Sequence, residues 1–473
     1  MDRAQHPDSS DGDDGSIVTR PESSAPVIVV GAGLAGLTCA AELTRAGRPV
    51  VVVEAGDGVG GRIRTDRRDG YLLDRGFQVI LDAYPALRRQ VDLADLQPAA
   101  FDSGATIWDG RRLHSLADPT RHPRALGEDL RSPLFGVMDR VRVAALGFRA
   151  RTASWPSARE AAGDPDTDRS GADLLWDSGF GRRFVDGFAR PFWGGITLDP
   201  SLAGSQGTLR YTLKMFLEGR AVLPESGMQA LPERLASRLR LGTVRYNTTV
   251  EGLVREGDRV VGIRVRGETW PASGVVVATD PVTARRLTGD ERFPDDSSGL
   301  GCTTIYLKGR RPPGIGRRLL LDGSGRLSVN HVAPLSNVQP SYAPRGRHLL
   351  AAVLLGEHAA NLDDEAVAGQ ARAETVRMLG HSANEWDILS VVRVPFSQFA
   401  QPPGIYGRLP ATDSGTSGLV YAGEATADSS QNGAILSGEA AARAILGTVP
   451  LTEPRQPHPA LSVQQELDDD PSW

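Results

Sequence analysis

A glycine-rich turn between two short runs of β-branched residues constrains this chain more than any other feature of its sequence. Val27–Val30 and Val50–Val53 each predict a buried parallel strand, because both runs are short and uninterrupted. Gly31, Gly33 and Gly36 follow the first run in GxGxxG spacing, and the alanine- and leucine-rich stretch after them predicts a helix. The segment therefore predicts a β–α–β unit in which the glycine turn opens the helix.

The spacing of the three glycines fits a turn that binds a dinucleotide. Gly31 permits the tight turn, Gly33 lets the backbone approach a pyrophosphate, and Gly36 lets the helix pack close to the strand. The helix N-terminus offers N–H groups and a positive dipole end to the phosphates. Glu54 ends the second strand, where its carboxylate can accept hydrogen bonds from a ribose diol. The candidate binding residues of this unit are Gly31, Gly33, Leu34, Ala35, Gly36, Glu54 and Ala55.

A second glycine motif follows within a few residues. Gly60, Gly61 and Arg62 allow another loop to reach the same pyrophosphate, although alone they also fit a solvated turn. With this motif the sequence resembles the superfamily of flavin-containing amine oxidases, phytoene desaturases and protoporphyrinogen oxidases. The resemblance implies that the two motifs bind FAD and that the protein is an FAD-dependent oxidoreductase. Neither cysteine precedes the C-terminal motif where covalent attachment requires one, so we expect FAD to be bound non-covalently.

The C-terminal part of the chain carries the other half of the resemblance. A short apolar strand at residues 419–421 leads into Gly423 and Glu424, and a helix built from small residues opens at Gly433 and Ala434. The resemblance implies that the Gly423–Glu424 turn meets the ribityl and phosphate part of FAD. It also implies that the helix points its N-terminus at the flavin pyrimidine ring, with small residues closing on the ring. Without the resemblance, the same segment fits a packing helix.

The resemblance also implies how the chain is organised. We expect an α/β fold with a Rossmann-like, glutathione-reductase-type FAD-binding domain and an inserted α+β substrate domain, with backbone near Val250 at the adenine end. The predicted FAD-binding segments are 26–84, 221–299 and 397–448, the substrate segments are 85–220 (helical) and 300–396 (sheet), and 1–25 and 449–473 are disordered tails.

The substrate is less constrained by the sequence. Gln78, Phe192 and Trp193 are candidates for the substrate pocket, although each aromatic residue also fits plain core. Amine oxidases in the superfamily commonly place an aromatic residue before the last helix and a lysine in the strand that opens the second insertion. Residues 429–432 contain no aromatic residue, and Lys308 comes late in its strand.

We therefore expect hydride transfer from a hydrophobic, polyisoprenoid-like substrate to flavin N5 in a desaturase-like reaction. The alternatives are an amine oxidase or protoporphyrinogen-oxidase-like enzyme, and a non-catalytic prenyl- or lipid-binding protein on the same fold. The reduced flavin would be reoxidised by O2, a quinone or another acceptor. The sequence identifies no catalytic residue.

Charge and composition exclude several other classes. The chain has 53 basic and 58 acidic residues, a net charge of −5, so it lacks the footprint of a nucleic-acid-binding protein. Its eight histidines and two cysteines show no metal-ligand spacing, so we expect no metal site. No apolar run reaches the ~20 residues of a membrane span. We expect a cytoplasmic protein with a small-molecule substrate, and peripheral contact with a membrane stays open.

Overall fold

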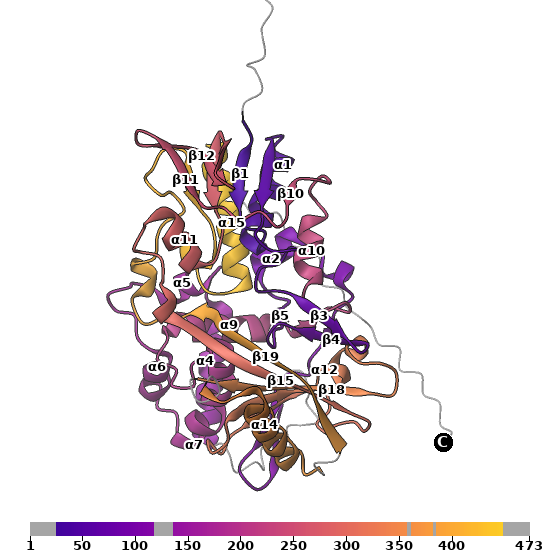
Figure 1. The fold of residues 1–473 in the computed structure, drawn as a ribbon. Helices are drawn as coiled ribbons and strands as arrows, with labels where there is room; N and C mark the ends of the chain where they lie inside the picture. Colours follow the sequence, from indigo (N-terminus) through magenta and orange to yellow (C-terminus); the bar gives the residue numbers. More distant parts are fainter. Residues whose placement is uncertain (1–24, 118–135, 357–360, 382–384, 448–473) are drawn as a thin grey trace, which may run out of the picture.

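The computed structural model describes residues 25–117, 136–356, 361–381 and 385–447. Apart from residue 25, the two predicted tails lie outside these ranges. In Figure 1 the N- and C-terminal strands and helices lie together in the upper part, and a large sheet with its covering helices forms the lower part. No helix in the described ranges is long and apolar enough to cross a membrane.

A parallel five-stranded sheet holds the predicted β–α–β unit. Strands β1 (Val27–Val30) and β2 (Val50–Val53) pair in parallel on either side of the connection through helix α1 (Leu34–Arg45), as the sequence predicts. The sheet order is β10-β2-β1-β14-β20. Its other strands are β10 (Val244–Arg245), β14 (Gly274–Val277) and β20 (Leu419–Tyr421). Its strands come from distant parts of the chain, and two of its inner strands, β1 and β14, are buried along their whole length.

Helices and a small sheet pack around these strands. Helix α1 contacts both α10 (Ala230–Ala236) and α15 (Gln431–Leu446), and strand β14 contacts the antiparallel sheet through β12. That sheet comprises β11 (Gly252–Glu256), β12 (Arg259–Val265) and β13 (Glu268–Pro271). The arrangement confirms the predicted Rossmann-like α/β fold. The domain boundaries drawn from the sequence stay a prediction.

The lower part is built on a seven-stranded sheet in the order β19-β15-β18-β17-β16-β7-β8. Helix α14 (Asp364–Leu379), which the sequence analysis did not predict, packs on its strands. Two strands, β7 and β8, come from the segment predicted to be helical, so that prediction is incomplete. The strands are β7 (Gly104–Trp108), β8 (Leu113–Ala117), β15 (Gly299–Gly309), β16 (Leu319–Asp322), β17 (Val329–Ala333), β18 (His348–Leu355) and β19 (Trp386–Phe399).

The helices of residues 136–218 contact both this sheet and the upper part. They are α4 (Val137–Thr152), α5 (Ala158–Ala162), α6 (Gly171–Asp177), α7 (Arg182–Phe184), α8 (Arg190–Thr197) and α9 (Gln206–Glu218). Among them, α8 contacts strands β16 and β17 of this sheet, and α5 packs into the core of the upper part. The shorter elements are β3 (Thr65–Arg68), β4 (Tyr71–Asp74), β5 (Ile80–Leu81), α2 (Pro85–Gln90), β6 (Ala99–Ala100), β9 (Ala221–Leu223), α11 (Pro281–Thr288) and α12 (Leu335–Val338).

The first and last long helices of the upper part touch backbone to backbone. A Cβ atom added at Gly438 of α15 would overlap the carbonyl oxygen of Ala35 and lie 2.9 Å from the Cβ of Thr38, both on α1. Only a residue without a side chain allows this approach. Gly438 therefore lets α15 pack against α1. That other small residues of this helix close on the flavin ring stays a prediction.

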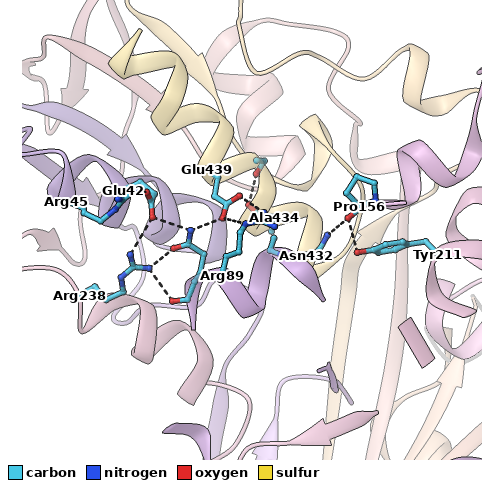
Figure 2. A network of polar contacts seen from close by, with 12 residues as sticks. Glu42, Arg45, Arg89, Pro156, Tyr211, Arg238, Asn432, Ala434 and Glu439 are labelled. Carbon is cyan, nitrogen blue, oxygen red and sulfur yellow. Dashed lines mark hydrogen bonds and ion pairs between the residues drawn. The ribbon is translucent and has the colours of Figure 1, made fainter. Parts of the chain in front are cut away.

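A polar network that also includes Glu42 of α1 holds the same helix (Figure 2). Glu439 of α15 is buried and accepts hydrogen bonds from Arg89 at 2.7 Å and from Gln90 at 2.8 Å, both in α2. Two turns earlier, Asn432 accepts a hydrogen bond from the backbone N–H of Ala86 and donates one to the carbonyl of Pro156. These contacts fix the position of the N-terminus of α15, because they hold its first and third turns to neighbouring elements.

The contact between α1 and α15 predicts opposite effects for two glycine-to-alanine changes in helices. Gly438→Ala should lower the free energy of unfolding by about 1–3 kcal/mol, because the new methyl group overlaps backbone that cannot move aside. Gly369→Ala in α14 meets no described atom within 4 Å. It should raise the free energy of unfolding by about 0.5–1 kcal/mol through helix propensity alone. The midpoint of thermal unfolding measures both, and equal shifts would contradict the proposed contact.

Candidate functional site

One large pocket connects the two parts of the molecule. Its volume is about 1460 Å³, larger than the roughly 300–1,000 Å³ of a usual small-molecule site. It is lined by the glycine turn before α1, by Glu54, by the loop at residues 60–63 and by the start of α15. The same pocket continues among helices α4, α6, α8 and α9 and strand β16 of the lower part. The volume and lining fit a dinucleotide together with a second molecule.

The glycine turn has the geometry that the sequence predicts. Gly31 has a φ of +106°, and a Cβ atom there would stand 2.7 Å from the carbonyl oxygen of Ala278 on the neighbouring strand. A Cβ atom at Gly36 would overlap the carbonyl oxygen of Gly31. Gly36 does not line the pocket, so its role is the close packing of α1 on β1.

Gly33 is different, because it faces open space. A Cβ atom at this position would meet no described atom within 4 Å, and its φ of −76° suits any residue. Gly33 lines the pocket together with Leu34 and Ala35, the first residues of α1. No side chain caps this helix N-terminus, and its first turn holds no acidic residue. The first N–H groups of the helix therefore fit a phosphate of a dinucleotide in this space.

Glu54 holds the turn as well as lining the pocket. Its Oε2 accepts a hydrogen bond of 2.8 Å from the N–H of Ala32, and its Oε1 accepts one of 2.8 Å from the N–H of Gly56. A carboxylate has about four acceptor sites, so it can still accept a hydrogen bond from a ribose hydroxyl. Glu54 thus links the glycine turn to the loop after β2, a role that the sequence did not reveal. Ala55 and Val250 line the pocket beside it.

An ion pair joins the two motifs that are farthest apart in the sequence. Nη2 of Arg62 lies 2.6 Å from Oε1 of Glu424, whose side chain is nearly buried. Arg62 also donates a 2.6 Å hydrogen bond to the carbonyl of Ser397, and Ser429 donates to the other oxygen of Glu424. Gly60, Gly61, Arg62, Gly423 and Glu424 all line the pocket. The charge of Arg62 is therefore matched by Glu424, and the pair closes one wall of the pocket.

The last helix begins at this wall. Ser430 precedes α15, and its side chain accepts a hydrogen bond from the N–H of Gly433. Ala434 lines the pocket, whereas Gly433 does not: a Cβ atom there would overlap the carbonyl oxygen of Asp428. The helix starts two residues earlier than its small residues suggest, because Gln431 and Asn432 already have helical geometry.

Four phenylalanines form a ladder along the lower part of the pocket. Phe180, Phe184, Phe188 and Phe192 follow one another at four-residue spacing. Successive ring centroids are 4.4, 5.6 and 5.2 Å apart, and all four rings line the pocket. The sequence analysis identified only Phe192, although the i, i+4 spacing of all four was visible in the sequence.

One turn of π-helix lies within this ladder and contains Phe188. Residues 185–189 form this turn between α7 and α8, and Pro191 is the second residue of α8. Proline has no N–H to donate, and a widened turn accommodates such a residue in a continuous helix. Trp193, the second aromatic candidate, is buried and donates to Thr212. Gln78 lines the pocket and donates to the carbonyl of Arg62.

Two buried polar residues on the pocket wall escaped the sequence analysis. Burial raises the pKa of Asp428 to about 6, with a contribution from nearby Glu160 and Glu424, and the backbone N–H of Ala158 donates to its carboxylate. Burial lowers the pKa of His331 to about 4, so it is neutral near pH 7. The sequence held no signal for either residue, because their burial arises only when distant segments pack together.

The side-chain amide of Asn330 fixes the ring of His331. The amide nitrogen of Asn330 donates a hydrogen bond of 2.8 Å to the carbonyl of Pro191. The same nitrogen lies 2.9 Å from Nδ1 of His331. Nδ1 is then an acceptor, and the proton of the neutral ring is on Nε2. By contrast, Lys308 lies away from the main pocket, beside a smaller one. Among the described residues no cluster of three His, Cys, Asp or Glu side chains could hold a metal ion.

Comparison with known proteins places the chain in context. The family model of flavin containing amine oxidoreductases matches residues 34–446. A phytoene dehydrogenase of Streptomyces griseus is 30% identical over 287 residues, which are 56% of this chain and 56% of that protein. A putrescine oxidase of Kocuria rosea is 40% identical over 96 residues, 20% of this chain and 19% of that protein. The chain therefore spans about half the length, or less, of these curated relatives.

Solved structures show the same fold. The structure of a cyclohexylamine oxidase from Brevibacterium oxydans superimposes with a TM-score of 0.65 at 17% identity, over 90% of this chain and 99% of that one. At this identity the likeness concerns the fold alone.

The open space at Gly33 predicts a variant that folds without cofactor. Gly33→Val should keep the thermal stability of the apoprotein and lose FAD, because the new side chain fills the space beside the first N–H groups of α1. Gly36→Ala should instead lower the stability of the apoprotein, because its methyl group overlaps Gly31. Flavin absorbance per protein and the midpoint of thermal unfolding separate the two effects. Full flavin content in Gly33→Val would contradict this site.

The double role of Glu54 predicts two simultaneous losses. Glu54→Ala should weaken FAD binding by about 1–3 kcal/mol, because the carboxylate can no longer accept hydrogen bonds from the ribose, and the N–H groups of Ala32 and Gly56 lose their acceptor. It should also lower the thermal stability of the apoprotein, which a residue that touches only the ribose would leave unchanged. Titration of the apoprotein with FAD and thermal unfolding without FAD test both parts. Glu54→Gln, which keeps one acceptor oxygen, should fall between alanine and the wild type.

Proposed function

The chain belongs to the family of flavin-containing amine oxidoreductases, and we propose that it oxidises a hydrophobic, polyisoprenoid-like substrate in a desaturase-like reaction. It is an FAD-dependent oxidoreductase, so the cofactor-free lipid-binding protein that we kept as an alternative is set aside. The proposal of a hydrophobic substrate rests on the phenylalanine ladder at residues 180, 184, 188 and 192. O2, a quinone or another acceptor that removes the electrons afterwards is part of the proposal.

The ladder supports an apolar substrate, because an apolar molecule that binds along the phenylalanine rings is removed from water. Phe192 also packs against Phe216 of α9 at 5.3 Å, so the ladder extends onto a second helix. Burial of apolar surface contributes roughly 25 cal/mol per Å². A long hydrocarbon chain can be held along such a wall without any charged partner. A small polar amine would bury little apolar surface against most of the ladder, so its binding would gain little free energy from these rings.

Different residues of this chain would bind the cofactor, hold the loops of its site together and align the substrate. The N–H groups at the start of α1 and the carboxylate of Glu54 would hold the pyrophosphate and ribose of FAD. When bound, FAD supplies the acceptor for a hydride that leaves a substrate C–H bond. The pair of Arg62 and Glu424 keeps the loops of the two motifs in contact. The ladder would exclude water and align the substrate, which is the main contribution we propose for the protein.

Amine oxidation is the second candidate, and two observations favour it. The relative from Kocuria rosea is a putrescine oxidase, and Asp428 and Asp139 place two carboxyl groups on the pocket wall. Asp428 is held by the N–H of Ala158, and Asp139 by the N–H of Gly181, so both already have partners in the protein. The wall at residues 429–431 offers only serine and glutamine side chains to a substrate. A porphyrinogen would be a third possibility for the same apolar wall.

The substrate proposal predicts a clear difference between ligand classes. Under argon, biogenic amines, polyamines and amino acids should not bleach the flavin absorbance at a useful rate. A polyene dispersed in detergent should bleach it or shift its spectrum. Stopped-flow mixing with a panel of amines, polyenes and porphyrinogens makes the measurement. Rapid bleaching by an amine at submillimolar concentration would replace the proposal with the second candidate, and bleaching by a porphyrinogen alone would replace it with the third.

The ladder itself can be tested with a single truncation. Phe188→Ala should weaken binding of the polyene about tenfold or more, because a buried phenylalanine contributes roughly 1.5–3 kcal/mol. Flavin content should not change, because Phe188 is remote in the fold from the glycine turn. Trp176→Ala is the control: this side chain of α6 is exposed and does not line the pocket. Equal polyene affinities in both variants would contradict a role of the ladder.

A further inference from the structure

Helix α4 exposes an unusual amount of apolar surface. Ten large apolar side chains are exposed in the described part of the chain, and five of them lie on this one helix. Val137 and Phe148 are exposed by 72% and 70%, and Met138 by 58%. Single exposed apolar residues are normal on protein surfaces, but a cluster on one helix marks an interaction site.

The exposed residues of α4 form one stripe. Val137, Val141, Ala144 and Phe148 follow at spacings of four, three and four residues, so they lie on the same face of the helix. All four are exposed. We call these four residues the α4 stripe.

The stripe continues into the pocket. Ala144 and Phe148 belong to the stripe and also line the main pocket, together with Val143, Leu146 and Gly147 of the same helix. Helix α4 therefore forms part of the rim where the pocket meets the surface. It lies in the lower part of the molecule, near α9 (Figure 1).

The charge around the stripe is positive, although the whole chain is negative. Helix α4 carries four arginines, at positions 140, 142, 149 and 151, and a single acid, Asp139. Asp139 is buried and accepts hydrogen bonds from the N–H groups of Gly136 and Gly181. It also forms an ion pair with Arg142 at 3.4 Å, so the one acid of the helix is matched to one of its four arginines. Arg149 and Arg151 are exposed. The helix thus presents guanidinium groups beside apolar side chains, against a net charge of −5 for the chain.

We propose that the α4 stripe docks on the surface of an anionic lipid bilayer. An apolar face flanked by arginines suits the boundary between anionic headgroups and acyl chains. A second copy of this chain suits it less, because pairing two α4 helices would bring eight arginines together. A bilayer also explains why the stripe and the pocket rim share residues: an apolar molecule dissolved in the membrane could enter without crossing water.

Docking on lipid is independent of the chemistry at the flavin. Entry of the substrate from the bilayer does rest on the proposed hydrophobic substrate. A binding measurement without substrate therefore tests the surface alone, and its result does not depend on whether the substrate proposal holds.

Flotation of the full-length holoenzyme with vesicles tests the docking surface. One set of vesicles contains equal parts of phosphatidylglycerol and phosphatidylcholine, and the other contains phosphatidylcholine only. The wild type should float with the anionic vesicles and much less with the neutral ones. High salt should reduce flotation with the anionic vesicles, because it screens the arginines.

Variants outside the pocket lining identify the face responsible. The double variant Val137→Ser and Val141→Ser should lower partition onto anionic vesicles about tenfold or more, since it removes apolar contact with the acyl boundary. Arg149→Gln should lower the partition about fivefold. Leu241→Ser is the matched control, because Leu241 is fully exposed in the upper part of the molecule. It should float like the wild type. Thermal unfolding checks that each variant is folded.

Three results would overturn the proposal. The first is that the wild type fails to float with anionic vesicles. The second is that the Val137 and Val141 double variant floats as well as the Leu241 control. The third is that sedimentation shows a dimer of the wild type that the double variant loses, while flotation is unchanged. In that last case the α4 stripe is an interface between two copies of the chain.

Discussion

The close approach of helix α1 to the backbone around it is the constraint on which the rest of the structure depends. Because Gly36 has no side chain, helix α1 packs directly against the glycine turn. Gly438 likewise lets helix α15 pack directly against α1. No larger residue fits at either contact. Because α1 is held by backbone rather than by adaptable side chains, its N-terminus has one fixed position at the pocket. The sites that we propose for pyrophosphate and ribose depend on that position.

The second organising contact is the ion pair between Arg62 and Glu424. It joins residues that are more than 350 positions apart in the sequence, and it does so at the wall of the pocket. Glu54 acts similarly over a shorter range, by holding Ala32 and Gly56. In both cases a charged residue expected only to touch the cofactor also holds the loops that form its site. The residues that we propose to bind the cofactor therefore also shape the pocket wall.

The substrate side follows a different principle. The phenylalanine ladder and the α4 stripe are apolar surfaces that meet at one pocket, and neither depends on a particular polar partner. Periodicity in the sequence was sufficient to find the ladder, but only the structure shows that its rings, two of them part of a buried core, also line a cavity. Likewise, the sequence of α4 fits an ordinary amphipathic helix with a buried apolar face, and only the structure shows that many of its apolar residues are exposed. Buried groups such as Asp428 and His331 depend entirely on which segments pack around them.

The sequence by itself determined the β–α–β unit, the glycine turn, the strand before Gly423 and the family to which the chain belongs. These features are local, because spacing, β-branched residues and missing side chains limit the backbone directly. Tertiary structure alone decided that β7 and β8 join the large sheet, that Arg62 pairs with Glu424, and that Gly438 serves α1. Such contacts join segments that are distant in the chain, and many partners of similar chemistry would satisfy the same local pattern. Only the packing of the whole chain selects one of them.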